Sequence, residues 1–327
     1  MTSKLSLLAK IKKFGFNRIA IPKSVKIFGM EDALSSQEGY LTYSKKSPVR
    51  FDIPIEIGRR EGVDAPIIPK LLPRMMSCMK NMKQAIIDLD DNIKDSKRQI
   101  EKDELVELET YIRSLDISGI GYTTVPQDFI FANKAVAYEN AIVLTMNMDN
   151  KKVSIAPSKQ TAETIWHTYD NLGIAANKIA RYLRKKGFNA HASHPLGGIV
   201  LYPRLAEKAG LGGFGKSGIL ITPINGGTLR LAAVYTNIEN LPINEGNEHG
   251  WIMEYCKTCL RCVKECPPGA IYEKPIEHET GRVTHIDNEK CFPYFGNNYG
   301  CTVCIKVCPF NYTDYHAIKE GFMKRSK

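Results

Sequence analysis

The sequence predicts a mixed α/β or α+β body followed by a small cysteine-rich domain. Strand-like and helical runs alternate between residues 117 and 245, a polar linker follows at residues 240–250, and eight of the nine cysteines come after it. A chain of 327 residues can bury a sizeable core and divide into two domains. We therefore expect an N-terminal arm with amphipathic helices at residues 1–116, the body at residues 117–245 and the cysteine-rich domain at residues 246–327.

The first part of the chain mixes basic segments with short strand-like runs, at residues 18–21 and 51–57. Prolines recur through residues 1–74 and argue against long helices there, because proline lacks the backbone N–H that a helix uses. We interpret this stretch as an arm wrapped on the body. Apolar residues at helical spacings, first from Ile86 to Ile100 and then from Leu105 to Ile112, predict two amphipathic helices parted near residues 102–103.

The body begins with two strand-like runs, at residues 117–124 and 141–148. A long helix is predicted over residues 161–186, because an apolar stripe repeats at steps of four and three until Gly187 ends it. The stripe consists of Ile165, Tyr169, Leu172, Ala176, Ile179 and Leu183. The remaining predicted elements are a short helix at residues 204–209 and strands at residues 199–202, 218–222 and 229–236.

The composition is that of a soluble globular protein, with 43% hydrophobic and 24% charged residues. No apolar run approaches the ~18 residues typical of a membrane span. The first 26 residues are basic, and they lack the apolar run and cleavage site of a secretory signal. We therefore expect a cytoplasmic protein that does not contact a membrane.

The cysteines near the C-terminus form two related runs. The first reads C-x2-C-x2-C-x3-C-P from Cys256 to Pro267, which is the spacing of bacterial two-cluster ferredoxins. In that arrangement three cysteines bind one [4Fe-4S] cluster, and the fourth binds the other cluster. We therefore assign Cys256, Cys259, Cys262 and Cys308 to one cluster, and Cys266, Cys291, Cys301 and Cys304 to the second. Cys291 departs from the pattern, because it lies ten residues before Cys301.

Structural zinc and disulfides are the alternatives for these cysteines. Zinc favours two C-x2-C pairs separated by a longer gap, and disulfides need an oxidising compartment. Neither alternative explains two copies of C-x3-C-P. The remaining cysteine, Cys78, is expected to be a small buried side chain.

The net charge of +10 is compatible with attraction to nucleic acid or to an acidic electron donor. The lysines are spread along the chain, and no alternation of arginine with aromatic residues suggests base stacking. We favour a diffuse basic charge and do not expect nucleic acid as a partner. The sequence gives no indication of the oligomeric state.

A glycine-rich loop, residues 210–217, fits both the G-x4-G-K-[ST] and the G-x-G-x-x-G patterns. Both patterns bind phosphates only where a strand precedes the loop and a helix follows it. Here a helix-forming segment precedes the loop and a β-prone segment follows it. A nucleotide site is therefore not expected. The two remaining interpretations are a tight helix-to-strand turn and a backbone that closely approaches a bound group.

Residues 203–223 and 230–237, together with both cysteine runs, resemble the reductive dehalogenases and are similar to their relatives, the epoxyqueuosine reductases. The likeness covers about residues 117–315. It implies a nitroreductase-like body that holds a base-off cobalamin, and a ferredoxin-like domain that supplies its electrons. It also implies that the loop contacts the corrinoid through Ala209, Gly210, Leu211, Gly212, Gly215 and Lys216.

The resemblance further suggests three catalytic residues. Tyr169 stands thirteen residues before a Tyr-Leu-Arg run, where the dehalogenases have a proton-donating tyrosine. Arg230 matches a basic residue that assists this tyrosine, and His194 lies near a polar position ahead of the loop. The catalytic aspartate of the epoxyqueuosine reductases is replaced by Leu196, which argues against epoxyqueuosine as the substrate.

Each of these residues also has a structural interpretation. Tyr169 lies on the apolar stripe of its helix, where an aromatic side chain is usually part of the core. Arg230 would then pair with a surface acid, and His194 would be a loop residue, with His191 as its nearest competitor.

The leading hypothesis is a reductase in which a ferredoxin or flavodoxin reduces two [4Fe-4S] clusters, and these reduce a corrinoid that cleaves a small electrophilic substrate. The second hypothesis is an electron-transfer or reductive-activation protein without a corrinoid. The third is a nucleotide-hydrolysing protein that carries clusters, in which Lys216 would be essential for nucleotide binding.

Overall fold

The computed structural model describes residues 31–46, 48–63, 65–66, 68–243, 246–279 and 282–325. The strand expected at residues 18–21 lies outside these ranges.

The centre of the body is a four-stranded antiparallel sheet with the strand order β2-β4-β8-β5. Its strands are β2 (Gly119–Thr124), β4 (Asn140–Asn147), β8 (Leu229–Thr236) and β5 (Ala190–Ser193). Alternate residues of β4 face opposite sides, with Ile142 and Leu144 in one core cluster and Ala141 and Val143 in another. Because neighbouring strands are antiparallel, the body is of the α+β type.

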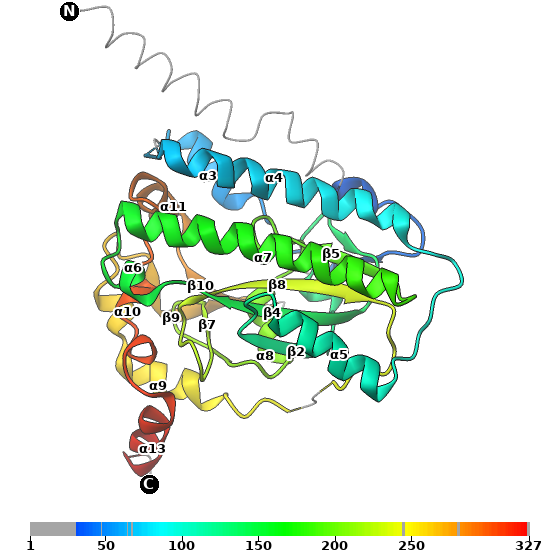
Figure 1. Cartoon of the computed structure of the whole chain (residues 1–327). Helices are drawn as coiled ribbons and strands as arrows, with labels where there is room; N and C mark the ends of the chain where they lie inside the picture. The colour runs from blue at the N-terminus through cyan, green and yellow to red at the C-terminus, as the bar shows by residue number, and fades with distance from the viewer. Residues whose placement is uncertain are drawn as a thin grey trace, which may run out of the picture.

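The long helix α7 (Lys159–Lys185) covers one face of this sheet. Its apolar stripe is buried except for Tyr169, which is half-buried. The Ser158 hydroxyl caps its first turn by accepting a hydrogen bond from the Thr161 backbone N–H. Helix α4 (Leu72–Ile87) packs on the outer side of α7. Helix α5 (Lys102–Arg113) also contacts α7 (Figure 1). Helix α8 (Tyr202–Lys208) packs on the opposite face of the sheet.

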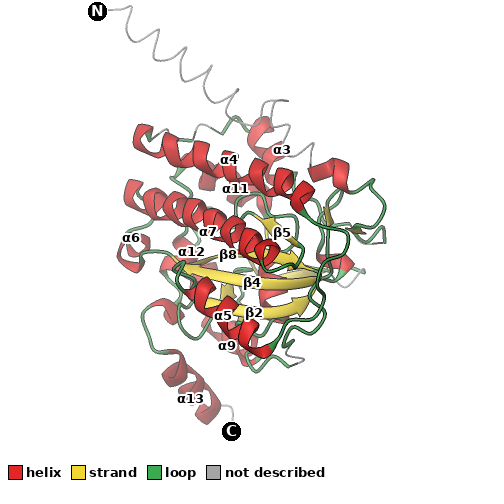
Figure 2. Ribbon diagram, turned by 45° about the vertical axis from the view of Figure 1, so that its right-hand side comes forward, coloured by secondary structure: helices red, strands yellow, loops and turns green. Residues whose placement is uncertain are grey.

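The cysteine-rich part lies at one end of α7, beyond the edge of the sheet (Figures 1 and 2). It contains five helices and a β-hairpin among the described residues. They are α9 (Trp251–Cys259), α10 (Arg261–Lys264), β9 (Ile271–Glu277), β10 (Val283–Ile286), α11 (Asn288–Asn297), α12 (Val303–Lys306) and α13 (Tyr315–Arg325). The hairpin was not expected from the sequence.

Short elements connect these parts. They are β1 (Leu41–Thr42), η1 (Pro69–Leu71), η2 (Asp88–Asp91), η3 (Gln127–Phe129), β3 (Ala135–Val136), α6 (Asn150–Ser154), β6 (Gly213–Phe214), β7 (Leu220–Ile221) and η4 (Pro309–Asn311). Strand β1 pairs with β3 on the body, and β6 pairs with β7.

Two predicted strands are wrong. Residues 51–57 alternate like a strand, but the chain forms helix α3 (Ile53–Arg60), because Pro54 lies in the first turn, where no backbone donor is needed. Residues 199–202 make only one isolated bridge, between Val200 and Ile130. Tyr202 begins α8, again with a proline in the first turn.

The predicted helix through Ile86 to Ile100 is too long. Helix α4 ends at Ile87, η2 follows, and the chain then runs without a helix to residue 101, where Ile93 is 52% exposed. The second predicted helix corresponds to α5, which begins at Lys102 after a capping box between Glu101 and Glu104.

The other predicted elements of the body are found. The strands predicted at residues 117–124, 141–148, 218–222 and 229–236 correspond to β2, β4, β7 and β8, and the helices predicted at residues 161–186 and 204–209 correspond to α7 and α8. Strand β5 was missed. Within the described ranges, no helix is both long enough and apolar enough to cross a membrane.

Leu172 offers a test of the packing between α7 and the sheet, because its side chain is fully buried. We expect Leu172→Ala to lower the free energy of unfolding by about 2–5 kcal/mol, since it leaves a cavity in the core. Val106 is 59% exposed on α5, so Val106→Ala is the control and should change stability by no more than ~0.5 kcal/mol. Denaturant unfolding of both variants under anaerobic conditions measures the difference; equal losses would contradict this packing.

Candidate functional site

The first set of cysteines lines one cavity. Cys256, Cys259, Cys262 and Cys308 all border it, and Cys304 also reaches its wall. Helix α9 carries the first two, and Leu260, with a left-handed backbone at φ +51°, turns the chain so that α10 can carry the third. The fold therefore gathers the four residues that the spacing assigned to one cluster.

The second set gathers beside the first. Burial and the nearby Cys266 and Cys301 raise the pKa of Cys291 to about 11. Cys304 lies on α12 and is also close to Cys301 and Cys291. Cys291 lies on α11, and it is close to Cys266 and Cys301 although it comes ten residues before Cys301 in the sequence.

The loop that carries Cys301 has an unusual backbone. Residues 299, 300, 301 and 302 all have positive φ angles, of 55°, 79°, 33° and 68°. Only Gly300 adopts such angles without strain, and each of the other three residues costs on the order of 1–3 kcal/mol. Such outliers concentrate at functional sites, because surrounding contacts must hold them in place.

All nine cysteines are free thiols, so none is used in a disulfide. Burial raises the pKa of Cys256 to about 11 and that of Cys308 to about 12. A buried thiol gives up its proton readily only where a cation stabilises the thiolate, and bound iron supplies that charge. The donor set, two groups of four thiols, therefore fits two [4Fe-4S] clusters.

The glycine loop lies between a helix and a strand, as predicted. Gly210 follows α8 with φ +72°, and the chain then forms the β6–β7 hairpin. A Cβ atom on Gly212 would overlap the Ile221 carbonyl oxygen, and one on Gly213 would overlap that of His249. Gly212 and Gly213 are thus required because other parts of the chain approach them closely. Ala209 and Leu211, on either side of Gly210, pack on strand β2 beside Gly121.

Lys216 lies at the tip of this hairpin and is only 5% exposed. Its Nζ atom donates a hydrogen bond to the Glu273 carbonyl oxygen at 3.0 Å, and the residue borders the cavity lined by Cys256. The Lys216 ammonium group is thus engaged by a backbone carbonyl, and cysteine thiols are among the residues that line the same cavity. This environment does not resemble a phosphate-binding loop.

Tyr169 and Arg230 lie together. The Arg230 guanidinium carbon is 4.9 Å from the centre of the Tyr169 ring, over its face. Tyr169, Ile219 and Cys304 each pack against one set of buried apolar residues, at the boundary between the body and the cysteine-rich part. That set consists of Met148, Val153, Ile165 and Ile305. Among the described residues Arg230 forms no ion pair with an acid, and its Nη1 atom donates a hydrogen bond to the Leu229 carbonyl oxygen at 3.4 Å.

His194 lies under the same helix. It is 5% exposed, and its ring packs so closely against Gly173 that a Cβ atom there would overlap its Nε2 atom. Burial lowers the pKa of His194 to about 4, so the ring is neutral at pH 7. Its Nδ1 atom accepts a hydrogen bond from the Leu196 backbone N–H at 3.0 Å. His191 is also buried and accepts a hydrogen bond from the Ala137 backbone N–H at 3.2 Å.

Several buried polar atoms near these residues have no hydrogen-bond partner in the described part of the chain. They include the Nε atom of Arg230, the Oγ1 atoms of Thr228 and Thr302, and the Nε2 atom of His194. Buried polar groups are normally paired, so unpaired ones suggest a ligand. Sequence reasoning missed Thr228 and Thr302, because no motif marks them and only the fold brings them to this boundary.

The comparisons with known proteins agree with the cysteine pattern. Residues 255–312 match the family model of the 4Fe-4S dicluster domain. The chain is 32% identical over 186 residues to a tetrachloroethene reductive dehalogenase of Desulfitobacterium hafniense, which covers 53% of this chain and 33% of that protein. The corresponding enzyme of Sulfurospirillum multivorans is 32% identical over 184 residues, covering 53% and 35%.

This chain is also similar in sequence to epoxyqueuosine reductases. That of Francisella cf. novicida is 33% identical over 129 residues, which cover 34% of this chain and 32% of that protein. The expected resemblance to both groups is confirmed, and the dehalogenase matches cover more of the chain. All these relatives are named as reductases. The chain spans about a third of the length of the curated relatives it matches.

Solved structures show the shared fold. A catabolic reductive dehalogenase in complex with 3-bromo-4-hydroxybenzoic acid has a TM-score of 0.65 and 16% identity, covering 87% of this chain and 44% of that chain. A second reductive dehalogenase structure, described as suggesting a mechanism for B12-dependent dehalogenation, has a TM-score of 0.64 and 16% identity, with coverages of 88% and 45%.

The glycine loop can be tested with two alanine variants. We expect Gly212→Ala to lower the free energy of unfolding by about 1–3 kcal/mol, because its Cβ atom would overlap the Ile221 carbonyl group. Gly246 has open space around it, so Gly246→Ala is the matched control. Thermal unfolding of both variants distinguishes them. If Gly212→Ala is as stable as the control, the glycine serves something other than this internal contact.

Proposed function

We propose that this chain is an iron–sulfur reductase whose two [4Fe-4S] clusters deliver electrons to an acceptor bound beside Tyr169 and Arg230. One observation carries the proposal: Cys304, of the second cysteine set, packs in the same apolar cluster as Tyr169. An iron–sulfur cluster held by Cys304 would therefore lie near Tyr169 and its arginine. The dicluster domain match and the reductase names of the relatives support the same assignment.

The two sets of cysteines suggest a direction for the electrons. The second set adjoins Tyr169, so it would be the exit. The first set would be the entrance, and exposed Lys257 and Arg261 lie among its cysteines. Basic side chains at an entrance would attract an acidic donor, for which we propose a ferredoxin or a flavodoxin.

For the acceptor we propose a base-off corrinoid, held by a nitroreductase-like body. A corrinoid has peripheral amides, and the unpaired Nε atom of Arg230 and Oγ1 atoms of Thr228 and Thr302 could bond to them. The residues at this boundary thus fit the group, whereas the glycine loop adds little, since its own chain fills the space beside Gly212 and Gly213. When bound, the corrinoid would supply low-potential cobalt chemistry for the reductive cleavage of a small electrophile.

The three predicted catalytic residues would then have different roles. Tyr169 would donate a proton from its hydroxyl group, and Arg230 would hold the ring through a cation–π contact. His194 is neutral and packed behind α7, so it would act as a positioning residue. With Leu196 at the position of the catalytic aspartate, we do not propose epoxyqueuosine as the substrate.

The alternative is an electron-transfer or reductive-activation protein without a corrinoid. The internal packing of the glycine loop favours it, because the glycines need no cofactor to explain them.

Metal analysis tests the leading proposal. Protein purified anaerobically from a host supplied with cobalamin should contain about eight iron atoms per chain and about one cobalt atom. Cys308→Ala should lose iron, because one ligand of the first cluster is missing, while Cys78→Ala, at a buried cysteine outside both runs, should retain it. Full iron without cobalt would reject the corrinoid and leave the alternative.

Tyr169→Phe tests the proton donor. We expect turnover of an organohalide panel to fall by roughly 10²-fold or more, as is typical for removal of a general acid, with iron and cobalt contents unchanged. The control is Tyr182→Phe, which removes a hydroxyl group from the same helix thirteen residues later. Turnover that is equal in the two variants would remove the Tyr169 hydroxyl from the mechanism.

A further inference from the structure

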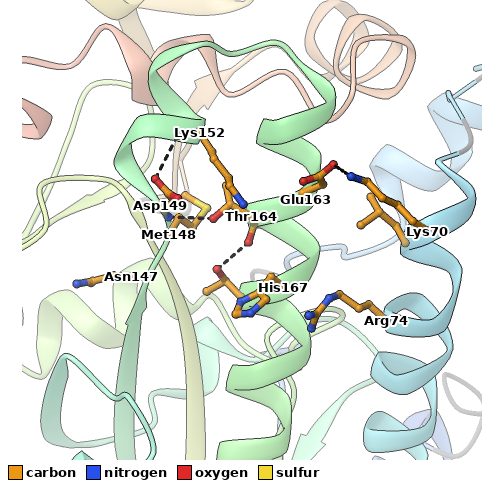
Figure 3. Close-up of a pocket in the computed structure, with 11 residues that line it drawn as sticks. Lys70, Arg74, Asn147, Met148, Asp149, Lys152, Glu163, Thr164 and His167 are labelled. Atoms are coloured by element: carbon orange, nitrogen blue, oxygen red, sulfur yellow. Dashed lines mark hydrogen bonds and ion pairs between the residues drawn. The ribbon is translucent and has the colours of Figure 1, made fainter.

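A cavity of about 600 Å³ lies between the start of α4, the first half of α7 and the turn that joins β4 to α6 (Figure 3). Its size is within the range of small-molecule sites. The residues that line it belong neither to the cysteine motifs nor to the positions suggested by the resemblance. They include Lys70, Leu71, Arg74, Met148, Asp149, Lys152, Glu163 and His167.

The acidic groups at this cavity are already engaged. The Asp149 carboxylate caps α6 by accepting hydrogen bonds from the backbone N–H groups of Lys151 and Lys152, at 2.9 and 3.2 Å. Glu163 forms an ion pair with Lys70 across the rim. These contacts hold the two carboxylates at the start of α6 and on Lys70, where each keeps its negative charge.

The lining carries one positive charge in excess, because Lys70, Arg74 and Lys152 face only the two carboxylates of Asp149 and Glu163. In Figure 3 the Lys152 side chain runs into the cavity, and within the described ranges its Nζ atom has no hydrogen bond or ion pair. Arg74 makes only a long contact, 3.4 Å, with Asp170. Their charges also reach His167: burial lowers its pKa, and Arg74 and Lys152 lower it further.

The cavity also has an apolar wall, formed by Leu71 and Met148. Met148 packs on its other side in the apolar cluster that contains Tyr169. A molecule in the cavity would therefore lie near the Tyr169–Arg230 pair.

We propose that this cavity binds a small organic anion, with a carboxylate or phosphate oxygen between Arg74 and Lys152 and an apolar body against Leu71 and Met148. Two charge-assisted hydrogen bonds in a partly buried site would give both affinity and selection for the anion. This binding does not depend on the clusters or on any electron transfer.

Calorimetric titration of the cluster-loaded protein tests the proposal, with benzoate as the probe. We expect saturable binding of benzoate and at least ~10-fold weaker binding of benzamide, which has the same shape without the charge. Inorganic phosphate, which has no apolar body, should bind more weakly than benzoate. Phosphate binding without benzoate binding would overturn the organic part of the proposal.

Lys152→Gln should weaken benzoate binding by roughly 10-fold, because one charged donor is lost. Lys151→Gln is the matched control, since Lys151 is an exposed neighbour that does not line the cavity. Arg74→Gln gives an independent second loss from another helix. Benzoate that fails to saturate in the wild-type protein, or equal weakening by Lys151→Gln and Lys152→Gln, would overturn the site. Iron content and unfolding temperature confirm that each variant is folded.

Discussion

The apolar contact at which α12 meets α6 and the first half of α7 is the one on which the proposed chemistry depends. It contains Ile165 and Ile305, has Tyr169 and Cys304 packed against it, and joins the cysteine-rich part to the sheet-bearing body. The contact is apolar, with a hydrogen bond from the Lys306 ammonium group to the Ala156 carbonyl oxygen at 2.9 Å beside it. Apolar side chains exclude water from the interface, so the electrostatic effect of Arg230 on its surroundings is less screened there.

The sequence predicted best those features that depend on local spacing. The cysteine runs are read from a few neighbouring residues, and the fold brings all eight of these cysteines to one part of the molecule. Their division between two clusters stays a prediction. The apolar stripe of α7 and the strand β8 were also found, because their periodicities are long and regular. The proximity of Tyr169 and Arg230 was expected only from the resemblance, since 60 residues of sequence lie between them.

The misses have physical reasons. Strand β5 (Ala190–Ser193) is short and has few β-prone residues, so its partner β8 determines its conformation. In α3 and α8, a proline in the first helical turn outweighs a strand-like pattern of neighbouring side chains. The cavity beside α4 is assembled from three separate segments, and no sequence window contains enough of it to be recognised.

The left-handed run at residues 299–302 has a consequence for how the protein matures. Its backbone cost must be offset by contacts made in the folded state, and iron bound to Cys301 would supply part of that stabilisation. Before the metal arrives, this loop would relax toward ordinary backbone angles and loosen the packing of Ile305, on α12, in the apolar contact with α6 and α7. Cluster insertion would then be the step that completes the domain junction, and assembly of the active protein would depend on the supply of iron and sulfide.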